Sequence, residues 1–513
     1  MKANGVMILD FGSQYTKLIA RRVREESIYS EIFPHSVKLD QIKKIKPAAL
    51  ILSGGPSSVF SDNALKIDPE ILKQNIPILG ICYGLQLLAY TYDGMVEEKK
   101  SGEYGLSKLN IDNSHKIFSN VPNEINTWMS HMDQVTKVPP NWNVIAKSSN
   151  DIIAAVSNEE SSRVGLQFHP EVIHTQYGKE ILRNFLIKIA KCPKDWNASN
   201  YVADQINKIR REVGKEKLII GVSGGVDSTV AAALIHKAIG DQSKAVLIDH
   251  GLMRKDESKI CIAALKKGLG VNIHSYDESE VFLSKLENKK DPEEKRKIIG
   301  NQFIKSFEKI SKKFGDIKYL AQGTLYPDVI ESGFGVGGKS HTIKSHHNVG
   351  GLPDKMNFKL IEPLRDLFKD EVRKVGVELG LPSDLVKRHP FPGPGLGVRI
   401  IGKITKDRIK ILQEADQIFI DILHEDGLYD DIWQAFAVLI PIKTVGVMGD
   451  QRTYENLLAL RAVTSTDGMT ADWFKIPDHS LSKISNKIVN SDKGINRVVY
   501  DITSKPPGTI EWE

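Results

Sequence analysis

The sequence has little cysteine, little excess charge and no long apolar run. Its 513 residues include three cysteines, Cys82, Cys192 and Cys261. These are too few for a disulfide framework, so a reducing cytoplasm is the expected location. No apolar run approaches the roughly 18–20 residues that cross a bilayer. The N-terminus becomes acidic at Asp10, too early for a secretory signal. We therefore expect no membrane partner.

The charge balance is equally uninformative about partners. A net charge of +6 is small for this length, and the lysines are scattered through amphipathic stretches. Such lysines usually cover solvated helix faces, so no nucleic-acid partner is expected. A hydrophobic share of 41% with 26% charged residues is typical of globular protein. The length exceeds a single core and predicts two to four domains.

Strand-like and helix-like runs alternate along the chain, which predicts parallel α/β packing. The expected strands are 5–10, 48–52, 76–79, 164–168, 217–222, 245–249, 319–322, 434–441 and 497–502. The expected helices include 16–25, 85–92, 178–190, 293–314 and 406–424. A stretch between Pro327 and Pro353 that is rich in Gly, Ser and His has no clear period, as in a mobile lid or binding loop.

Two breaker segments set the expected domain boundaries. The polar, proline-broken run 192–199 reads as a linker, and 390–397 is the strongest Pro/Gly cluster in the chain. We therefore expect domains at 1–192, 200–390 and 391–513.

The first motif with chemical content surrounds Cys82. The run Gly80-Ile-Cys82-Tyr-Gly84 follows an apolar strand and precedes a helix, as in a nucleophile elbow. Flanking glycines permit the tight turn, and the helix N-terminus stabilises a thiolate. Cys192 and Cys261 lack this setting and are expected to be inert.

A histidine and a carboxylate follow the strand expected at 164–168. The strand period of two places His169 and Glu171 on the same side, where the histidine can take the thiol proton and the carboxylate can orient the ring. A strand-end glycine pair, Gly54 and Gly55, can supply one oxyanion-hole N–H and Tyr83 a second.

Together these residues resemble the class I glutamine amidotransferases over about residues 5–190. The ordered runs are DFGSQY (10–15), SGGP (53–56), GICYG and QFHPE (167–171). The resemblance implies that Cys82 attacks the side-chain amide of glutamine, releases ammonia and forms a thioester that water hydrolyses. It also implies that Gln86 holds the substrate glutamine.

A second glycine turn lies between a strand-like and a helix-like run. Backbone N–H groups at such a turn bind phosphates with the help of the helix dipole, but the lysine of the common phosphate loop is missing. The run SGGVDS resembles the signature of the ATP pyrophosphatases, in which pyrophosphate leaves and a substrate oxygen becomes adenylated. The implied ATP-binding residues are Ser223, Gly224, Gly225, Val226, Asp227, Ser228 and Thr229.

Over essentially its whole length the chain resembles the glutamine-hydrolysing GMP synthases. Further matching runs include DHGLMRK (249–255), HPFPGPGLGVR (389–399) and SKPPGTIEWE (504–513). The implied fold has two parallel-sheet α/β domains, one amidotransferase-like and one adenine nucleotide α-hydrolase-like, plus a smaller α+β C-terminal domain. The implied reaction adenylates XMP with ATP, and ammonia then displaces AMP to give GMP.

The same resemblance implies further contacts. Arg296, Lys505 and Glu511 are expected to bind XMP, and the third domain to form a homodimer. Asp227 is a candidate Mg²⁺ ligand, because hard cations prefer carboxylates. The candidate lid residues are Asp328, Glu331, Lys344, His346 and His347.

Three alternatives stay open at this point. A glutamine-dependent NAD synthetase shares the ATP pyrophosphatase chemistry but has a different type of glutaminase. A tRNA-modifying pyrophosphatase would carry paired cysteines and a concentrated basic face. A silent regulatory scaffold would not need both sets of residues.

Overall fold

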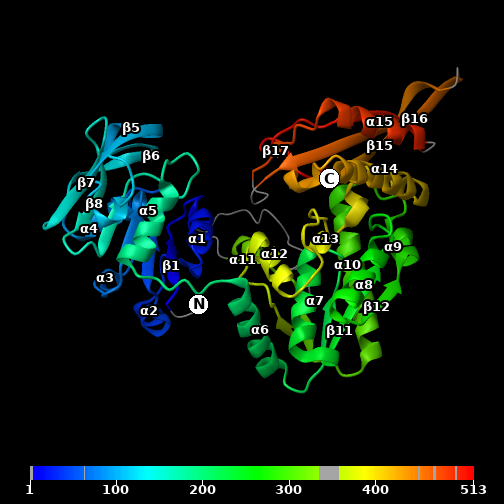
Figure 1. The fold of residues 1–513 in the computed structure, drawn as a ribbon, viewed down its shortest axis with the longest axis horizontal. Coiled ribbons are helices and arrows are strands. Elements are labelled where there is room, and N and C mark those ends of the chain that lie inside the picture. Colours follow the sequence, from blue (N-terminus) through cyan, green and yellow to red (C-terminus); the bar gives the residue numbers. More distant parts are fainter. Residues whose placement is uncertain (1–3, 63, 334–357, 449–450, 466–469, 492–493) are drawn as a thin grey trace. The chain divides into compact units, whose positions relative to one another are not determined.

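A computed structural model describes residues 4–62, 64–333, 358–448, 451–465, 470–491 and 494–513. The chain divides near residue 200 into two compact units, which are described separately below (Figure 1). Among the described residues, no helix combines the length and the apolar character that a membrane span requires. The three-domain division at 1–192, 200–390 and 391–513 stays a prediction.

The first unit is built on a nine-stranded sheet. Its strand order is β2-β1-β3-β4-β9-β8-β7-β5-β6, with the first five strands parallel and the others antiparallel. The strands are β1 Val6–Asp10, β2 Ser30–Pro34, β3 Ala49–Leu52, β4 Ile78–Ile81, β5 Met95–Ile111, β6 Glu124–Lys137, β7 Trp142–Ser148, β8 Ile153–Asn158 and β9 Arg163–Leu166. The parallel strands β3, β4 and β9 are buried throughout, as near-continuous apolar runs predict.

Five helices of this unit link or cover the strands. They are α1 Thr16–Glu25, α2 Leu39–Ile45, α3 Pro69–Leu72, α4 Tyr83–Thr91 and α5 Gly178–Asn184. The expected helix 178–190 is confirmed to within one residue: α5 ends at Asn184, and a π-helical turn, Phe185–Ile189, continues it. The chain order moves outward from β1 to β2 and back to β3, so the strand order reverses between β1 and β3. Ligands of open α/β sheets bind at the carboxyl ends of the strands beside such a reversal.

The second unit contains a five-stranded parallel sheet in the order β12-β11-β10-β13-β14. Its strands are β10 Leu218–Gly221, β11 Ser243–Asp249, β12 Ile273–Asp277, β13 Tyr319–Ala321 and β14 Lys359–Ile361. Its helices are α6 Ala198–Val213, α7 Val226–Ile239, α8 Glu257–Leu269, α9 Ser279–Leu286, α10 Pro292–Ser311, α11 Tyr326–Gly333, α12 Lys369–Glu378 and α13 Ser383–Val386. The strand order reverses beside β10, which places the turn after β10 at the expected ligand edge.

A smaller sheet completes the second unit. It comprises β15 Gln434–Met448, β16 Gln451–Thr464, β17 Asp472–Trp473 and β18 Ile495–Tyr500, with helices α14 Lys406–Glu425 and α15 Asp478–Ser491. One apolar core joins this part to the five-stranded sheet, since Val246 and Phe307 belong to the same buried cluster as Phe419 and Leu439. The expected strand 434–441 is too short, because β15 passes through Pro441 at a register irregularity and continues to Met448.

Candidate active sites

The first site is built on the turn between β4 and α4. Cys82 has φ 53° and ψ −105°, a backbone conformation rarely adopted by residues other than glycine. The turn is closed tightly, because a Cβ on Gly84 would lie 2.4 Å from the Leu52 carbonyl oxygen. A Cβ on Gly80 would lie 2.5 Å from the Gly84 backbone. The turn around Cys82 therefore requires glycine at positions 80 and 84, because neither position has room for a Cβ.

His169 and Glu171 form a buried pair. The Nδ1 atom of His169 lies 2.7 Å from Oε1 of Glu171, and the two residues are 4% and 0% exposed. The expected strand 164–168 is too long: β9 ends at Leu166, so the pair lies in the turn that follows. Burial opposes the charged imidazolium, but the Glu171 carboxylate and a hydrogen bond with Cys82 outweigh it and raise the pKa of His169 to about 10.

Other groups surround the thiol. The Sγ atom of Cys82 lies 3.7 Å from both the Ser130 carbonyl oxygen and Nε2 of Gln167. Gln86, which is buried on α4, donates from Nε2 to the Asp133 carbonyl oxygen at 2.9 Å. Neither Ser130 nor Asp133 was expected from the sequence, because β6 carries no motif around them.

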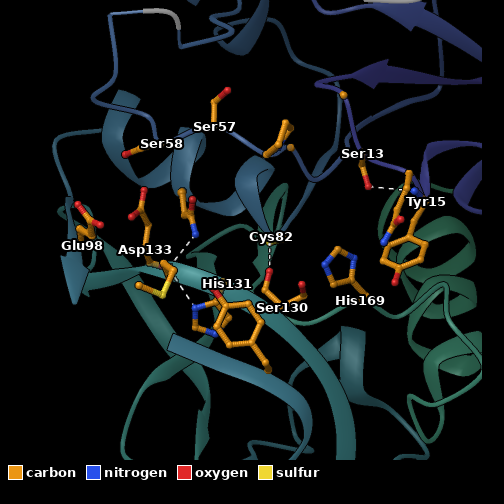
Figure 2. A pocket seen from close by; sticks show the side chains of 17 residues that line it. Ser13, Tyr15, Ser57, Ser58, Cys82, Glu98, Ser130, His131, Asp133 and His169 are labelled. Carbon is orange, nitrogen blue, oxygen red and sulfur yellow. Dashed lines mark hydrogen bonds between the residues drawn. The ribbon is translucent and has the colours of Figure 1, made fainter. Parts of the chain in front are cut away.

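A cavity of about 580 Å³ opens beside the thiol, and Ser130 and Asp133 line it (Figure 2). Cys82, Gln86 and His169 reach it, as does Gly55 of the expected oxyanion pair. Gly54 lies beside the base, since a Cβ there would lie 3.3 Å from Cε1 of His169. The backbone N–H of Tyr83 is at the start of α4, while its side-chain hydroxyl donates away from the thiol to the Leu65 carbonyl oxygen.

The other two cysteines are in a different environment. Burial raises the pKa of Cys192 to about 12 and also raises the pKa of Cys261. Both thiols are thus held protonated at neutral pH, as expected of inert cysteines.

The second site follows β10, where Ser223–Gly225 turns into α7. Gly224 has φ +81°, which glycine adopts without strain. The hydroxyl of Ser228 receives a hydrogen bond from the Ser223 N–H at 3.1 Å and lies 3.0 Å from the Ser223 hydroxyl. Val226 and Thr229 are buried in the first turn of the helix. The Gly225 N–H donates to the Ser223 hydroxyl at 3.4 Å. The backbone N–H groups available to a phosphate are therefore those at the start of α7.

Two cations that the sequence did not reveal contact this turn. Lys369, at the start of α12, donates to Oδ2 of Asp227 at 2.5 Å. Arg388 donates to the Gly224 carbonyl oxygen at 3.0 Å and pairs with Glu257 at 3.3 Å. No local motif marks either residue, because each is more than 140 positions from its partner in the turn.

The C-terminal segment is held by buried cations. Arg399 donates to both carboxylate oxygens of Glu511, at 2.8 and 3.1 Å. Lys295, fully buried on α10, pairs with Glu513 at 2.5 Å, and Arg296 donates to the Glu513 carbonyl oxygen. Lys505 lies on the same segment, its backbone paired with Ala471. Arg296 thus contacts the segment that carries Glu511, at a residue two positions further on.

The expected lid is described only at its start. The sequence predicted a loop from Pro327, but α11 continues to Gly333. Oδ2 of Asp328 accepts from the Leu325 N–H at 3.0 Å, a contact that supports the beginning of this helix. Glu331 lies on α11, whereas Lys344, His346 and His347 fall outside the described residues.

Family models match three parts of the chain. Residues 7–189 match "Glutamine amidotransferase class-I", 198–306 match "NAD synthase" and 421–512 match "GMP synthase C terminal domain". With the two sites above, these matches define a glutamine amidotransferase joined to an ATP pyrophosphatase.

Curated relatives are similar over the full length. The GMP synthase [glutamine-hydrolyzing] of Lactobacillus johnsonii is 54% identical, over 99% of this chain and 98% of that protein. The enzyme of the same description from Chlorobaculum tepidum is 55% identical, over 99% of each chain. The chain belongs to the family of glutamine-hydrolysing GMP synthases.

Proposed function

We propose that the chain divides GMP synthesis between the Cys82 site and the turn after β10. As a member of this family, the chain is an ATP-dependent carbon–nitrogen ligase with glutamine as amide donor. The observation that carries the division is the presence of a thiol–imidazole–carboxylate group in one unit and a phosphate-type turn in the other.

In the first site, the Cys82 thiolate attacks the side-chain amide carbon of glutamine. Backbone N–H groups at Gly55 and Tyr83 are the candidate donors to the oxyanion. The carbon–nitrogen bond breaks as the His169 imidazolium gives its proton to the leaving nitrogen, releasing ammonia. Water, deprotonated by the now neutral His169, hydrolyses the thioester to glutamate. Glu171 keeps the ring oriented through both steps.

In the second site, the XMP 2-oxygen attacks the α-phosphorus of ATP and pyrophosphate leaves. The backbone N–H groups at the start of α7, which follows the 223–225 turn, and the ammonium of Lys369 stabilise the charge that develops on the leaving phosphates. Ammonia then attacks C2 of the adenylated intermediate, and AMP leaves with the oxygen. Arg296 and Lys505 supply cations for the XMP phosphate, and Glu511 an acceptor for purine N–H groups.

Mg²⁺ is the proposed metal of the ATP site. Oδ1 of Asp227 is buried and accepts no hydrogen bond from another described group, which fits a carboxylate with one oxygen free for a hard cation. When bound, Mg²⁺ would neutralise charge on the ATP phosphates. The Lys369 ammonium occupies the other oxygen.

A homodimer in the cytoplasm is the proposed assembly and location. The β15–β16 hairpin of the C-terminal part carries exposed apolar side chains at Ile442, Val445, Val447 and Tyr454. Exposed apolar patches of this kind mark association surfaces. Light scattering after gel filtration tests the dimer, and Val447→Glu should shift it to monomer.

The acceptor assay tests the whole assignment. Purified protein is given ATP, Mg²⁺, glutamine and either XMP or nicotinic acid adenine dinucleotide, and AMP is measured. We expect AMP, pyrophosphate and GMP when XMP is the acceptor, and no AMP when the dinucleotide is the acceptor. AMP with the dinucleotide, or salt-sensitive tRNA binding, would favour the alternatives instead, and ADP formation would refute the adenylation chemistry.

A further inference from the structure

A second carboxylate–histidine pair lies beside the thiol pocket. Glu103 on β5 and His131 on β6 are directly opposite in the antiparallel register. Their side chains are 7% and 1% exposed. The strands approach closely at Gly102, where a Cβ would lie 2.2 Å from the His131 carbonyl oxygen. A register irregularity between Glu98 and Glu103 sets this pairing.

Glu103 and His131 each use one polar atom in hydrogen bonds to other groups. The remaining polar atoms of the two side chains face each other. Oε1 of Glu103 accepts from Oγ of Ser148 and Nδ2 of Asn150, both at 2.9 Å. Oε2 of Glu103 lies 3.5 Å from Nε2 of His131, and neither atom is hydrogen-bonded to another described group. Nδ1 of His131 lies 3.1 Å from the Asp133 carbonyl oxygen. Because a carbonyl only accepts, Nδ1 carries the hydrogen.

This arrangement calls for one shared proton. A neutral ring with hydrogen on Nδ1 presents the Nε2 lone pair to a carboxylate oxygen, so two acceptors face each other. A single proton between Nε2 and Oε2 removes the repulsion, whichever atom carries it. Burial lowers the pKa of His131 and the Glu103 carboxylate opposes this, while His169, which lines the same pocket, lowers it further.

The pair is connected to the glutamine pocket through Asp133. The Asp133 carbonyl oxygen accepts from both Nδ1 of His131 and Nε2 of Gln86. Three residues earlier, the Ser130 carbonyl oxygen faces the Cys82 thiol. Figure 2 shows Ser130, in this view, between the rings of His131 and His169. The 130–133 segment thus contributes one carbonyl to the thiol and another to Gln86.

We propose that Glu103 and His131 are positioning residues for glutamine: sharing one proton, they fix the Asp133 carbonyl that holds Gln86 in the pocket. The proposal rests on the glutaminase function proposed for Cys82. Neither residue touches the reacting atoms, so losing the pair should weaken glutamine binding more than the chemical step. Synthesis from added ammonium should be unaffected.

Two substitutions at one position test the proposal. Glu103→Gln keeps an oxygen for Ser148 and Asn150 and offers an N–H to Nε2 of His131, so its KM for glutamine should stay within about threefold of wild type. Glu103→Leu removes the facing group and should raise this KM at least about tenfold, with kcat within about threefold. Both should make GMP from ammonium at the wild-type rate.

Controls separate positioning from misfolding. Glu124→Gln removes an exposed β6 carboxylate that pairs with Lys108, and it should leave both kinetic constants unchanged. Alkylation of Cys82 by iodoacetamide should proceed in Glu103→Leu at a rate close to wild type, showing an intact elbow. The proposal is overturned if Glu103→Gln is impaired as much as Glu103→Leu, or if Glu103→Leu keeps the wild-type KM. Absence of glutamine-dependent activity in the wild type would instead refute the proposed function.

Discussion

Replacing Glu171 with glutamine removes a single charge from the thiol site. The carboxylate is fully buried and 2.7 Å from Nδ1 of His169. Glu171→Gln keeps the size and a hydrogen-bond acceptor, so the ring can stay in place. Only the electrostatic support of the imidazolium is lost.

The expected magnitude follows from the pKa of His169. It stands at about 10 against an ordinary value of 6.5, despite burial that favours the neutral ring. The difference of about 3.5 units corresponds to about 5 kcal/mol of support for the imidazolium. Cys82 supplies part of this support. In the Glu171→Gln variant, the side-chain amide oxygen at position 171 still accepts a hydrogen bond from Nδ1 of His169. A net loss of about 2–3 kcal/mol remains, which lowers kcat for glutamine roughly 100-fold.

The assay compares two nitrogen sources. GMP formation with saturating glutamine should fall roughly 100-fold in Glu171→Gln, while formation with ammonium should stay within about twofold of wild type. Glutamate release, measured in parallel, should fall with the glutamine-dependent rate. A variant whose glutamine-dependent kcat stays within threefold of wild type would refute the reasoning, since the carboxylate would then not be supporting the imidazolium.

Three further predictions follow from the same contacts. Cys82→Ala should abolish GMP formation with glutamine and spare it with ammonium, and equal loss with both would contradict the division of labour. Asp227→Ala should lower AMP release at least about 100-fold with either nitrogen source, because it removes the carboxylate proposed as the Mg²⁺ ligand of the ATP site; retained turnover would exclude the turn from the chemistry. Burial lowers the pKa of His389 to about 4, with nearby cations including Arg254 adding to the effect. The native ring therefore stays neutral while the unfolded chain takes up a proton below pH 6.5, so this histidine reduces the free energy of unfolding by up to about 3 kcal/mol as pH falls from 6.5 to 4. Denaturant titrations at pH 7 and 4.5 should show that the free energy of unfolding decreases less in His389→Gln than in the wild type. An equal decrease in the two proteins would contradict this role of His389.

The local features of both sites were predictable from the sequence. Gly80 and Gly84 flank Cys82 because the backbone approaches within distances that no Cβ tolerates. Such steric demands act over a few residues and leave a readable pattern. The approach of His169 to Glu171 was also expected, although through a strand that in fact ends at Leu166. Their spacing of two residues brought them together in a turn instead.

Contacts between distant segments were not predictable. Lys369 is 142 positions from Asp227, and nothing near it in the sequence marks a phosphate neighbour. Glu103 faces His131 only because of a register irregularity between β5 and β6. A shift of one residue would turn either side chain to the other face of the sheet. Pairings of this kind depend on the folded sheet and on no local pattern.

The two sites use the same structural device for different chemistry. Cys82 lies at the N-terminus of α4 and the 223–225 turn at that of α7, each after the carboxyl end of a strand that is parallel to both its neighbours. A helix N-terminus favours negative charge, whether on a thiolate or on phosphate oxygens. What distinguishes the sites is the side chain on the turn. A sulfur held in a strained conformation can attack a carbon, whereas a turn that presents amides beside Asp227 and Lys369 is suited to bind a polyphosphate and release pyrophosphate.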